Sequence, residues 1–271
     1  MTSEPAILSA LEDHVWTITI NRPERLNSLD PSSLEIIRNE FIRFRDTSEA
    51  RVAIITGTGQ KSFCTGADIK ATLSSDTPFA QGVFEPDERS IREGNYIRGL
   101  DLGRLGIGKP IIAAINGYAY GGGLELAMAC DIRLASTNAT FALSEVRIGS
   151  IPAVGGIQRL MRTVPHSAAL TMILTGDPVD AATASRIGLV SGVFEPAELM
   201  HEARRLADKI ASNAPLAVKA ALLLAKEGLD MAVPQAMLLE QFVWGALRDT
   251  EDRVEGRKAF AEKRQPTFRG R

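Results

Sequence analysis

Three consecutive glycines, Gly121 to Gly123, stand directly before an apolar segment that carries one carboxylate, Glu125. The composition of this segment predicts a helix that begins at the glycines. Backbone N–H groups in the first turn of a helix have no partner within the helix, and the helix dipole is positive there. Because glycine has no side chain, a ligand oxygen can approach this backbone closely. The segment is therefore a candidate oxyanion hole, which stabilises negative charge that develops on an oxygen.

A second candidate segment, KSFCTGADIK at 61–70, follows a predicted strand that ends at Thr56. Taken alone, its Gly-Ala-Asp sequence indicates a turn in which Asp68 fixes the backbone. The neighbouring GTGQKS does not form a phosphate-binding loop, because no glycine immediately precedes Lys61. A dinucleotide-binding fingerprint would need glycine where Ser62 stands. Both nucleotide-loop interpretations are excluded.

The elements that would position these segments alternate between strand and helix. Segments rich in Val, Ile and Thr predict strands at 14–20, 51–56, 110–116, 131–135 and 189–194. Between the first two, Pro31 to Arg45 has apolar residues at helical spacing, which makes a β-α-β unit. The pattern predicts an α/β core over 1–195 with mainly parallel strands. Only helical periodicity follows, which predicts a helical region over 196–271.

Composition narrows the classes of partner. The chain has 271 residues, is 45% hydrophobic and carries a formal charge of −2, so nothing favours nucleic acid or an anionic membrane. No apolar run approaches the roughly 20 residues of a membrane helix, and no secretion signal is visible, so we expect a cytoplasmic protein. Cys64 and Cys130 are expected to be buried thiols, and the three histidines have no metal-ligand spacing, so no metal is expected.

Three segments together resemble the crotonase superfamily, also called the enoyl-CoA hydratase/isomerase family. They are KSFCTGADIK at 61–70, KPIIAAINGYAYGGGLELAMACDIRLAS at 109–136 and FALSEVRIGSIPAVGGIQRL at 141–160. The resemblance extends from Asn21 almost to the C-terminus. It implies a spiral of ββα turns followed by a C-terminal helical region that mediates trimers, with hexamers as dimers of trimers. It also implies an acyl-CoA thioester as substrate, with coenzyme A as part of that substrate and no separate cofactor.

By this resemblance the backbone N–H groups of Ala67 and Gly122 form the oxyanion hole for the thioester oxygen. Family members that hydrate a 2-enoyl-CoA carry two catalytic glutamates, which correspond to Glu125 and to Glu145, 20 residues later. The helix dipole should keep Glu125 anionic and able to accept a proton from water. Glu145 has apolar neighbours that include Ile148, which should keep it protonated and able to donate to Cα.

The resemblance also implies a coenzyme A site. Arg25 and Leu26 match the segment that lines the groove, and Trp244 matches an aromatic residue that reaches a neighbouring subunit's site in some members. The expected substrate- and CoA-binding residues are Arg25, Leu26, Ala67, Asp68, Ile69, Phe260 and Lys263.

Two departures from the family pattern leave the acyl chain open. Where many members have Gly-Ala-Gly-Gly-Thr, this chain has Ala153, Val154, Gly155, Gly156 and Ile157, with bulkier groups that can narrow the acyl pocket. The segment from Thr72 to Asn95, expected to be a loop that shapes the acyl tunnel, is longer than in many short-chain hydratases.

The two glutamates favour a hydratase. An enoyl-CoA isomerase, or another acyl-CoA lyase or dehydratase, is the alternative on the same scaffold. One branch of the superfamily binds RNA through a lysine-rich first helix, but here Arg38, Arg43 and Arg45 are balanced by Glu35 and Glu40. RNA binding and a non-catalytic role are therefore remote alternatives.

Overall fold

The computed structural model describes residues 4–72 and 99–271 and contains two sheets. The predicted loop after Thr72 lies almost entirely outside these residues. The first sheet has the order β1-β2-β3-β5-β7-β10, and all its neighbours are parallel except the β1–β2 hairpin. Its strands are β1 (Ile7–Glu12), β2 (Val15–Ile20), β3 (Val52–Gly57), β5 (Ile111–Ile115), β7 (Ile132–Ser136) and β10 (Gly192–Phe194). The five predicted strands are confirmed, and β1 was not predicted.

The second sheet consists of very short strands. It has the order β4-β6-β8-β9, with β4, β6 and β8 parallel and β9 antiparallel. The strands are β4 (Ser62–Cys64), β6 (Tyr118–Tyr120), β8 (Thr140–Ala142) and β9 (Val179–Asp180). Each of β3, β5 and β7 in the first sheet leads directly to β4, β6 or β8 in the second. This repeated step is the ββα spiral that the resemblance implies.

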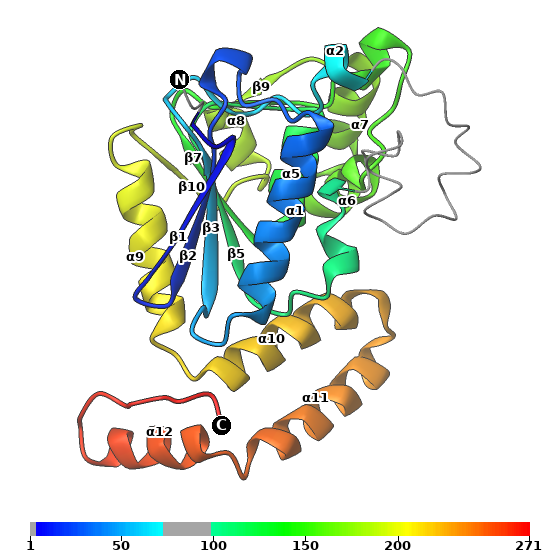
Figure 1. Cartoon of the computed structure of the whole chain (residues 1–271). Helices are drawn as coiled ribbons and strands as arrows, with labels where there is room; N and C mark the ends of the chain where they lie inside the picture. Colours follow the sequence, from blue (N-terminus) through cyan, green and yellow to red (C-terminus); the bar gives the residue numbers. More distant parts are fainter. Residues whose placement is uncertain (1–3, 73–98) are drawn as a thin grey trace.

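Helices cover both faces of the first sheet (Figure 1). On one face lies α1 (Pro31–Asp46), which buries Phe41 and Phe44; on the other lies α9 (Leu199–Ala211), which buries a stripe of alanines. Along β3, Ala53 and Ile55 pack into the core on the α1 side, while Val52 and Ile54 pack with α9. Because both faces are buried, the parallel strands read as continuous apolar runs.

Both ends of α1 agree with the sequence prediction. The Asp30 side chain accepts a hydrogen bond from the N–H of Ser33 at 2.8 Å, which caps the helix, and Pro31 occupies its first turn. The other helices described before α9 are α2 (Ile69–Thr72), α5 (Gly122–Ala129), α6 (Gly156–Thr163), α7 (His166–Thr175) and α8 (Ala181–Arg186). Short 3-10 turns include η1 (Pro23–Arg25), η3 (Leu102–Leu105) and η4 (Glu145–Ile148).

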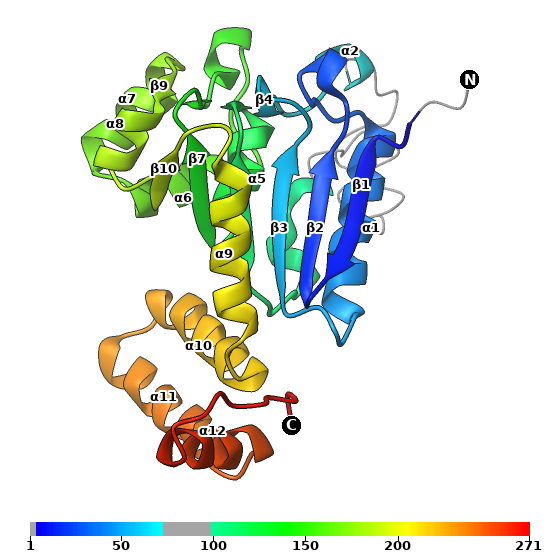
Figure 2. The same ribbon diagram turned by 90° about the vertical axis from the view of Figure 1, so that its left-hand side faces the viewer.

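The chain ends in three helices that extend away from the sheets (Figure 2). They are α10 (Pro215–Glu227), α11 (Val233–Leu247) and α12 (Glu251–Ala261), with the turn η5 (Gly228–Asp230) between the first two. Neither α10 nor α11 contains a buried residue, whereas α9 packs on the sheet. The boundary between core and helical region at residue 195 stays a prediction. The helix α9 follows this boundary and yet packs on the sheet. Within residues 4–72 and 99–271, no helix is long and apolar enough to cross a membrane.

Candidate active site

The two predicted oxyanion-hole residues lie beside each other. Gly122 is the first residue of α5, and Ala67 follows β4 by a short turn. A Cβ atom added to Gly122 would lie 3.8 Å from the backbone nitrogen of Ala67, and one added to Gly66 would lie 2.8 Å from the nitrogen of Gly122. The spiral thus brings two distant backbone segments into direct contact, and only glycine permits this approach.

In the part of the chain that the structure describes, the N–H groups of Ala67 and Gly122 have no hydrogen-bond acceptor and can bind a ligand. Ala67 is bridged to Leu29 through its neighbours: Leu29 donates to the carbonyl of Gly66 at 2.8 Å, and Asp68 donates to the carbonyl of Leu29 at 2.9 Å. The N–H of Ala67 therefore points away from Leu29. Within residues 4–72 and 99–271, neither Ala67 nor Gly122 donates a backbone hydrogen bond. Two adjacent free donors are what an oxyanion requires.

Glu125 is buried one turn into α5, where only 3% of the residue is exposed. Its Oε1 accepts hydrogen bonds from the N–H groups of Val154 at 2.7 Å and Gly156 at 2.8 Å. Burial raises the pKa of Glu125, while these two bonds and the positive charge of Arg159 oppose the rise. The helix dipole alone predicted an easily ionised carboxylate, but desolvation outweighs it.

Glu145 begins η4 and lies against Gly121, the residue before α5. Its Oε1 lies 3.0 Å from the position that a Cβ on Gly121 would occupy. Its Oε2 is buried and has no hydrogen-bond partner among the described residues. Burial and the negative charge of Glu125 raise the pKa of Glu145 to about 7. Ile148, expected to shield this carboxyl group, is instead 64% exposed, so desolvation comes from other neighbours.

The two carboxyl groups interact electrostatically but occupy different environments. Glu125 has an oxygen held by two backbone donors and a positive charge nearby, whereas Glu145 has an oxygen with no partner in the described chain. Such differences drive the pKa values of a pair apart, as in enzymes in which one carboxyl group acts as base and the other as acid. The arrangement suits transfer of protons to and from carbons next to a thioester.

The expected CoA-binding residues of the N-terminal half gather around the oxyanion hole. Leu26 has a left-handed backbone (φ 52°), and its carbonyl accepts hydrogen bonds from the hydroxyls of Ser62 at 2.7 Å and Thr65 at 3.2 Å. These bonds hold η1 against the turn that leads to Ala67. Arg25, at the end of η1, is exposed.

Asp68 and Ile69 continue directly from the oxyanion hole. Arg22 lies 3.7 Å from the Asp68 carboxylate and 2.9 Å from that of Asp30, so Asp68 belongs to a small ionic network. Ile69 begins α2 and is 52% exposed, which leaves its side chain accessible to a ligand.

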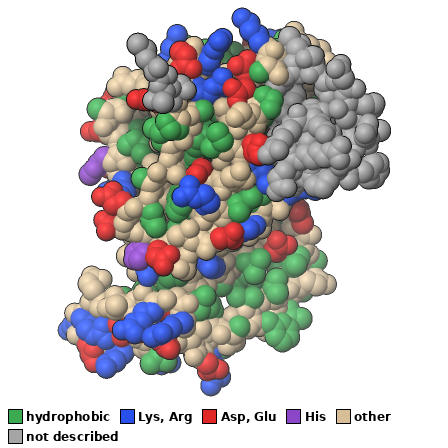
Figure 3. Space-filling view, viewed as in Figure 1, with side chains coloured by type: hydrophobic (Ala, Val, Ile, Leu, Met, Phe, Trp, Pro, Cys, Tyr) green, Lys and Arg blue, Asp and Glu red, His purple; other side chains and the backbone are tan. Residues whose placement is uncertain are grey.

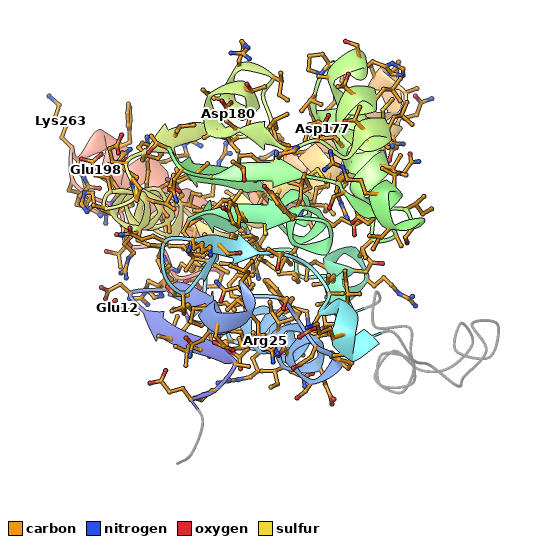
Figure 4. The ribbon with its side chains drawn as sticks, turned by 90° about the horizontal axis from the view of Figure 1, so that it is seen from above. Glu12, Arg25, Asp177, Asp180, Glu198 and Lys263 are labelled. Carbon is orange, nitrogen blue, oxygen red and sulfur yellow. The ribbon has the colours of Figure 1, made fainter. Side chains whose placement is uncertain are left out.

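The two expected CoA residues of the C-terminal region lie elsewhere. Phe260 in α12 is 88% exposed, and Lys263 follows that helix with a left-handed backbone. Figures 1 and 2 place α12 at the opposite end of the molecule from α2. Figure 4 shows Arg25 and Lys263 on separate elements, with side chains that do not converge. One chain therefore does not bring these two residues to the oxyanion hole. Trp244 in α11 is half-exposed, with the Arg253 guanidinium 5.5 Å from its ring centre.

Sequence reasoning missed the groups that hold Glu125. Val154 was expected to narrow the acyl pocket, but it is buried, and its N–H binds the Glu125 carboxylate together with that of Gly156. The glycine pair at 155–156 was an available signal, because glycines before a helix mark a second place where backbone donors meet an anion.

Comparisons with known proteins agree with this geometry. The family model described as "Enoyl-CoA hydratase/isomerase" matches residues 11–271. The (E)-benzylidenesuccinyl-CoA hydratase of Thauera aromatica is 47% identical over 96% of this chain and 97% of its own. The short-chain-enoyl-CoA hydratase of Clostridium acetobutylicum is 41% identical over 94% of both chains.

A solved structure shows that the similarity extends to the fold. The crystal structure of an enoyl-CoA hydratase from Bacillus anthracis superposes with a TM-score of 0.89 at 34% identity, covering 98% of this chain and 100% of the other. The fold is thus the crotonase spiral, and the chain is an enzyme of the hydro-lyase kind, like its hydratase relatives. This chain belongs to the enoyl-CoA hydratase/isomerase family.

Proposed function

We propose that this enzyme adds water across the 2,3 double bond of a 2-enoyl-CoA to give a 3-hydroxyacyl-CoA. The observation that carries the proposal is the pair of glutamates: Glu145 Oε1 lies against Gly121, and the negative charge of Glu125 acts on Glu145. Glu125 lies in the first turn of α5, the helix that begins at Gly122. The hydratase names of the two relatives support the same reaction.

The first half of the reaction uses Glu125 as the base. Glu125 accepts a proton from water while the water oxygen bonds to C3 of the substrate. The electrons of the double bond move toward the thioester, and its oxygen becomes the anionic oxygen of an enolate. The N–H groups of Ala67 and Gly122 stabilise that oxygen, each by about 3 kcal/mol if they behave like donors removed by mutagenesis elsewhere.

The second half uses Glu145 as the acid. Its raised pKa leaves a large protonated fraction near neutral pH, and this proton passes to C2 as the enolate collapses. Water has then contributed a hydroxyl to C3, and C2 has gained a proton. The proton held by Glu125 returns to Glu145 through exchange with solvent, which restores the starting state.

We also propose that the active enzyme is a trimer, or a hexamer built as a dimer of trimers. The C-terminal helices expose many apolar side chains, which Figure 3 shows at the surface of the end of the molecule that α10 and α11 form. The exposed residues include Leu223, Leu229, Met231, Val233, Met237, Leu238, Phe242 and Trp244. Surfaces of this kind mark protein interfaces. In such an assembly, Phe260 and Lys263 would reach the coenzyme A of a neighbouring subunit.

A substrate panel tests the proposed reaction. The purified enzyme is incubated with crotonyl-CoA, longer 2-enoyl-CoAs and (E)-benzylidenesuccinyl-CoA, and loss of the conjugated enoyl-thioester absorbance is measured. We expect hydration of at least one member, with the 3-hydroxy product identified by mass. A parallel assay follows conversion of 3-enoyl-CoA to 2-enoyl-CoA. Clean isomerisation without any hydration would reject the hydratase in favour of an isomerase.

A further inference from the structure

We infer that Arg159, in the first turn of α6, is a positioning residue for Glu125. The role is to hold the backbone that binds the Glu125 carboxylate and to keep that carboxylate ionised. This inference rests on the proposed function, in which Glu125 is the base. Arg159 acts through the Val154–Gly156 backbone.

The geometry connects Arg159 to Glu125 in two steps. Arg159 Nη1 donates a hydrogen bond to the carbonyl of Val154 at 2.6 Å. The backbone N–H of Val154 donates a hydrogen bond to Glu125 Oε1 at 2.7 Å, and the N–H of Gly156 donates to the same oxygen at 2.8 Å. A side chain on Gly155 would lie 2.5 Å from Arg159 Nη1, so the guanidinium lies directly against this turn. Arg159 therefore fixes the direction of the donors that hold Glu125.

The charge of Arg159 reinforces this position. The elements packed on α5 are α6, β4, β6 and η3. Arg159 on α6 lowers the pKa of Glu125, and Glu145 across the glycines contributes a negative charge. The strands β4 and β6 carry no charged side chain, and η3 carries only Arg104, which is exposed. Arg159 is thus the cation that opposes the burial of Glu125 from the α6 side.

Arg159 also borders a cavity of about 600 Å³ between α5, α6 and α10, which Met128, Asp131, Arg162 and Leu223 also line. Neither glutamate lines this cavity. This position fits a residue that holds the backbone around Glu125 without contacting the substrate.

The test uses three variants of the full-length enzyme. Arg159→Gln removes the charge and the long guanidinium, while Arg159→Lys keeps the charge but not the geometry. Arg162→Gln is the matched control, because Arg162 is exposed one turn further along the same helix. For each variant we measure kcat and KM as a function of pH, with a 2-enoyl-CoA that the wild type hydrates. Circular dichroism and thermal unfolding report whether the fold is retained.

Loss of the charge raises the pKa of Glu125, so less of the base is ionised at a given pH. The acid limb of the kcat profile is the pH range in which kcat falls as the pH is lowered. In Arg159→Gln we expect this limb to shift to higher pH by about half a pH unit or more, and kcat to be roughly tenfold lower. Arg159→Lys should restore the limb but not the full kcat, and Arg162→Gln should match the wild type. An acid limb in Arg159→Gln that coincides with the wild-type limb overturns the inference. A wild-type kcat in Arg159→Lys overturns the geometric part.

A second readout needs no turnover. The pKa of Glu125 is followed by ¹³C NMR of carboxyl-labelled glutamate, with the resonance assigned through Glu125→Gln. We expect a higher pKa in Arg159→Gln than in the wild type and Arg162→Gln, and an equal pKa would contradict the inference. If the wild type hydrates nothing while this shift is present, the proposed function fails and the electrostatic role of Arg159 stands. Should Arg159→Gln not fold, Arg159→Lys still tests the geometric part.

Discussion

Beside the N-terminal end of α5 the chain buries Glu125 and one carboxyl oxygen of Glu145, whereas along α11 it exposes Phe242 and Trp244. Both regions depart from the usual distribution of polar and apolar groups, but in opposite directions. Buried carboxyl groups gain altered proton affinities at the expense of folding stability. Exposed apolar groups contribute no burial energy within one chain, which is why we propose that α11 packs against another subunit. The comparison indicates that the proposed acid–base groups meet within one chain, whereas the proposed coenzyme A groups do not.

The largest expected effect is on the two carboxyl groups. Glu125→Gln and Glu145→Gln should each lower kcat by about a thousandfold, because neither amide can exchange the required proton. The rate of 2-enoyl-CoA hydration measures the loss. The control is Glu198→Gln, since Glu198 is exposed and lies away from Arg25 in Figure 4. Near wild-type hydration by either site variant would remove that glutamate from the mechanism.

A smaller effect is expected where the backbone holds Glu125. A Cβ on Gly156 would lie 2.8 Å from Glu125 Oε1 and 2.7 Å from a carbon of Pro152. Gly156→Ala should therefore displace the carboxylate and lower kcat by about a hundredfold. Gly245→Ala in α11 is the matched control, because open space surrounds that position. Equal activity of the two variants would show that the Gly156 contact does not position Glu125.

The pH profile separates the two glutamates. Glu145 must be protonated to act as an acid, and its pKa is raised to about 7. The kcat/KM for hydration should therefore fall by about tenfold for each pH unit well above pH 7. Because the two glutamates interact, the apparent pKa values taken from the pH profile belong to the pair and not to either residue alone. A profile that stays flat to pH 9 would argue against Glu145 as the acid.

In the C-terminal helices the expected effect is on assembly. Phe242→Ser removes a large side chain that is 69% exposed in one chain, and its burial between subunits should contribute about 2 kcal/mol. We expect the variant to dissociate at concentrations at which the wild type stays assembled, with a higher KM for acyl-CoA. Analytical ultracentrifugation measures the change. Leu8→Ser, on the exposed edge strand β1, should leave assembly unchanged.

The smallest expected effect is a gain in stability. In the unfolded chain Glu145 ionises near pH 4.5, whereas in the folded chain its pKa is about 7. Above pH 4.5 the unfolded state releases this proton more readily, so ionisation opposes folding, and the penalty is complete above pH 7. Glu145→Gln should raise the free energy of unfolding by about 1 kcal/mol at pH 8, allowing for partial solvent screening, and by little at pH 4.5. Denaturant titrations at the two pH values measure the difference.

Sequence patterns predicted the helices and strands that are long enough to show a regular pattern of apolar residues. The helix α1 and strands such as β3 bury long apolar runs, which periodicity detects. The strand β1 was missed because Ile7 is its one buried residue. The second sheet was missed because strands of two or three residues, such as β9, have no measurable period.

In the site, family resemblance placed Ala67 and Gly122 together, but composition and spacing alone had no means of doing so. Their contact depends on how two turns of the spiral pack. The pKa of Glu125 was expected to follow the helix dipole, yet burial dominates it. Burial and the support from Arg159 are properties of the packed chain, which local sequence does not contain.

The backbone contact between Gly66 and Gly122 has a consequence for how this enzyme can be altered. The two donors belong to main chain that is packed without intervening side chains, so their spacing does not depend on the identity of the residues around the acyl group. Substitutions along the acyl pocket can therefore redirect the enzyme toward other thioesters while the electrophilic part of the site stays intact. The same contact predicts that Gly66 tolerates almost no replacement in directed evolution, because a Cβ there would lie 2.8 Å from the backbone nitrogen of Gly122.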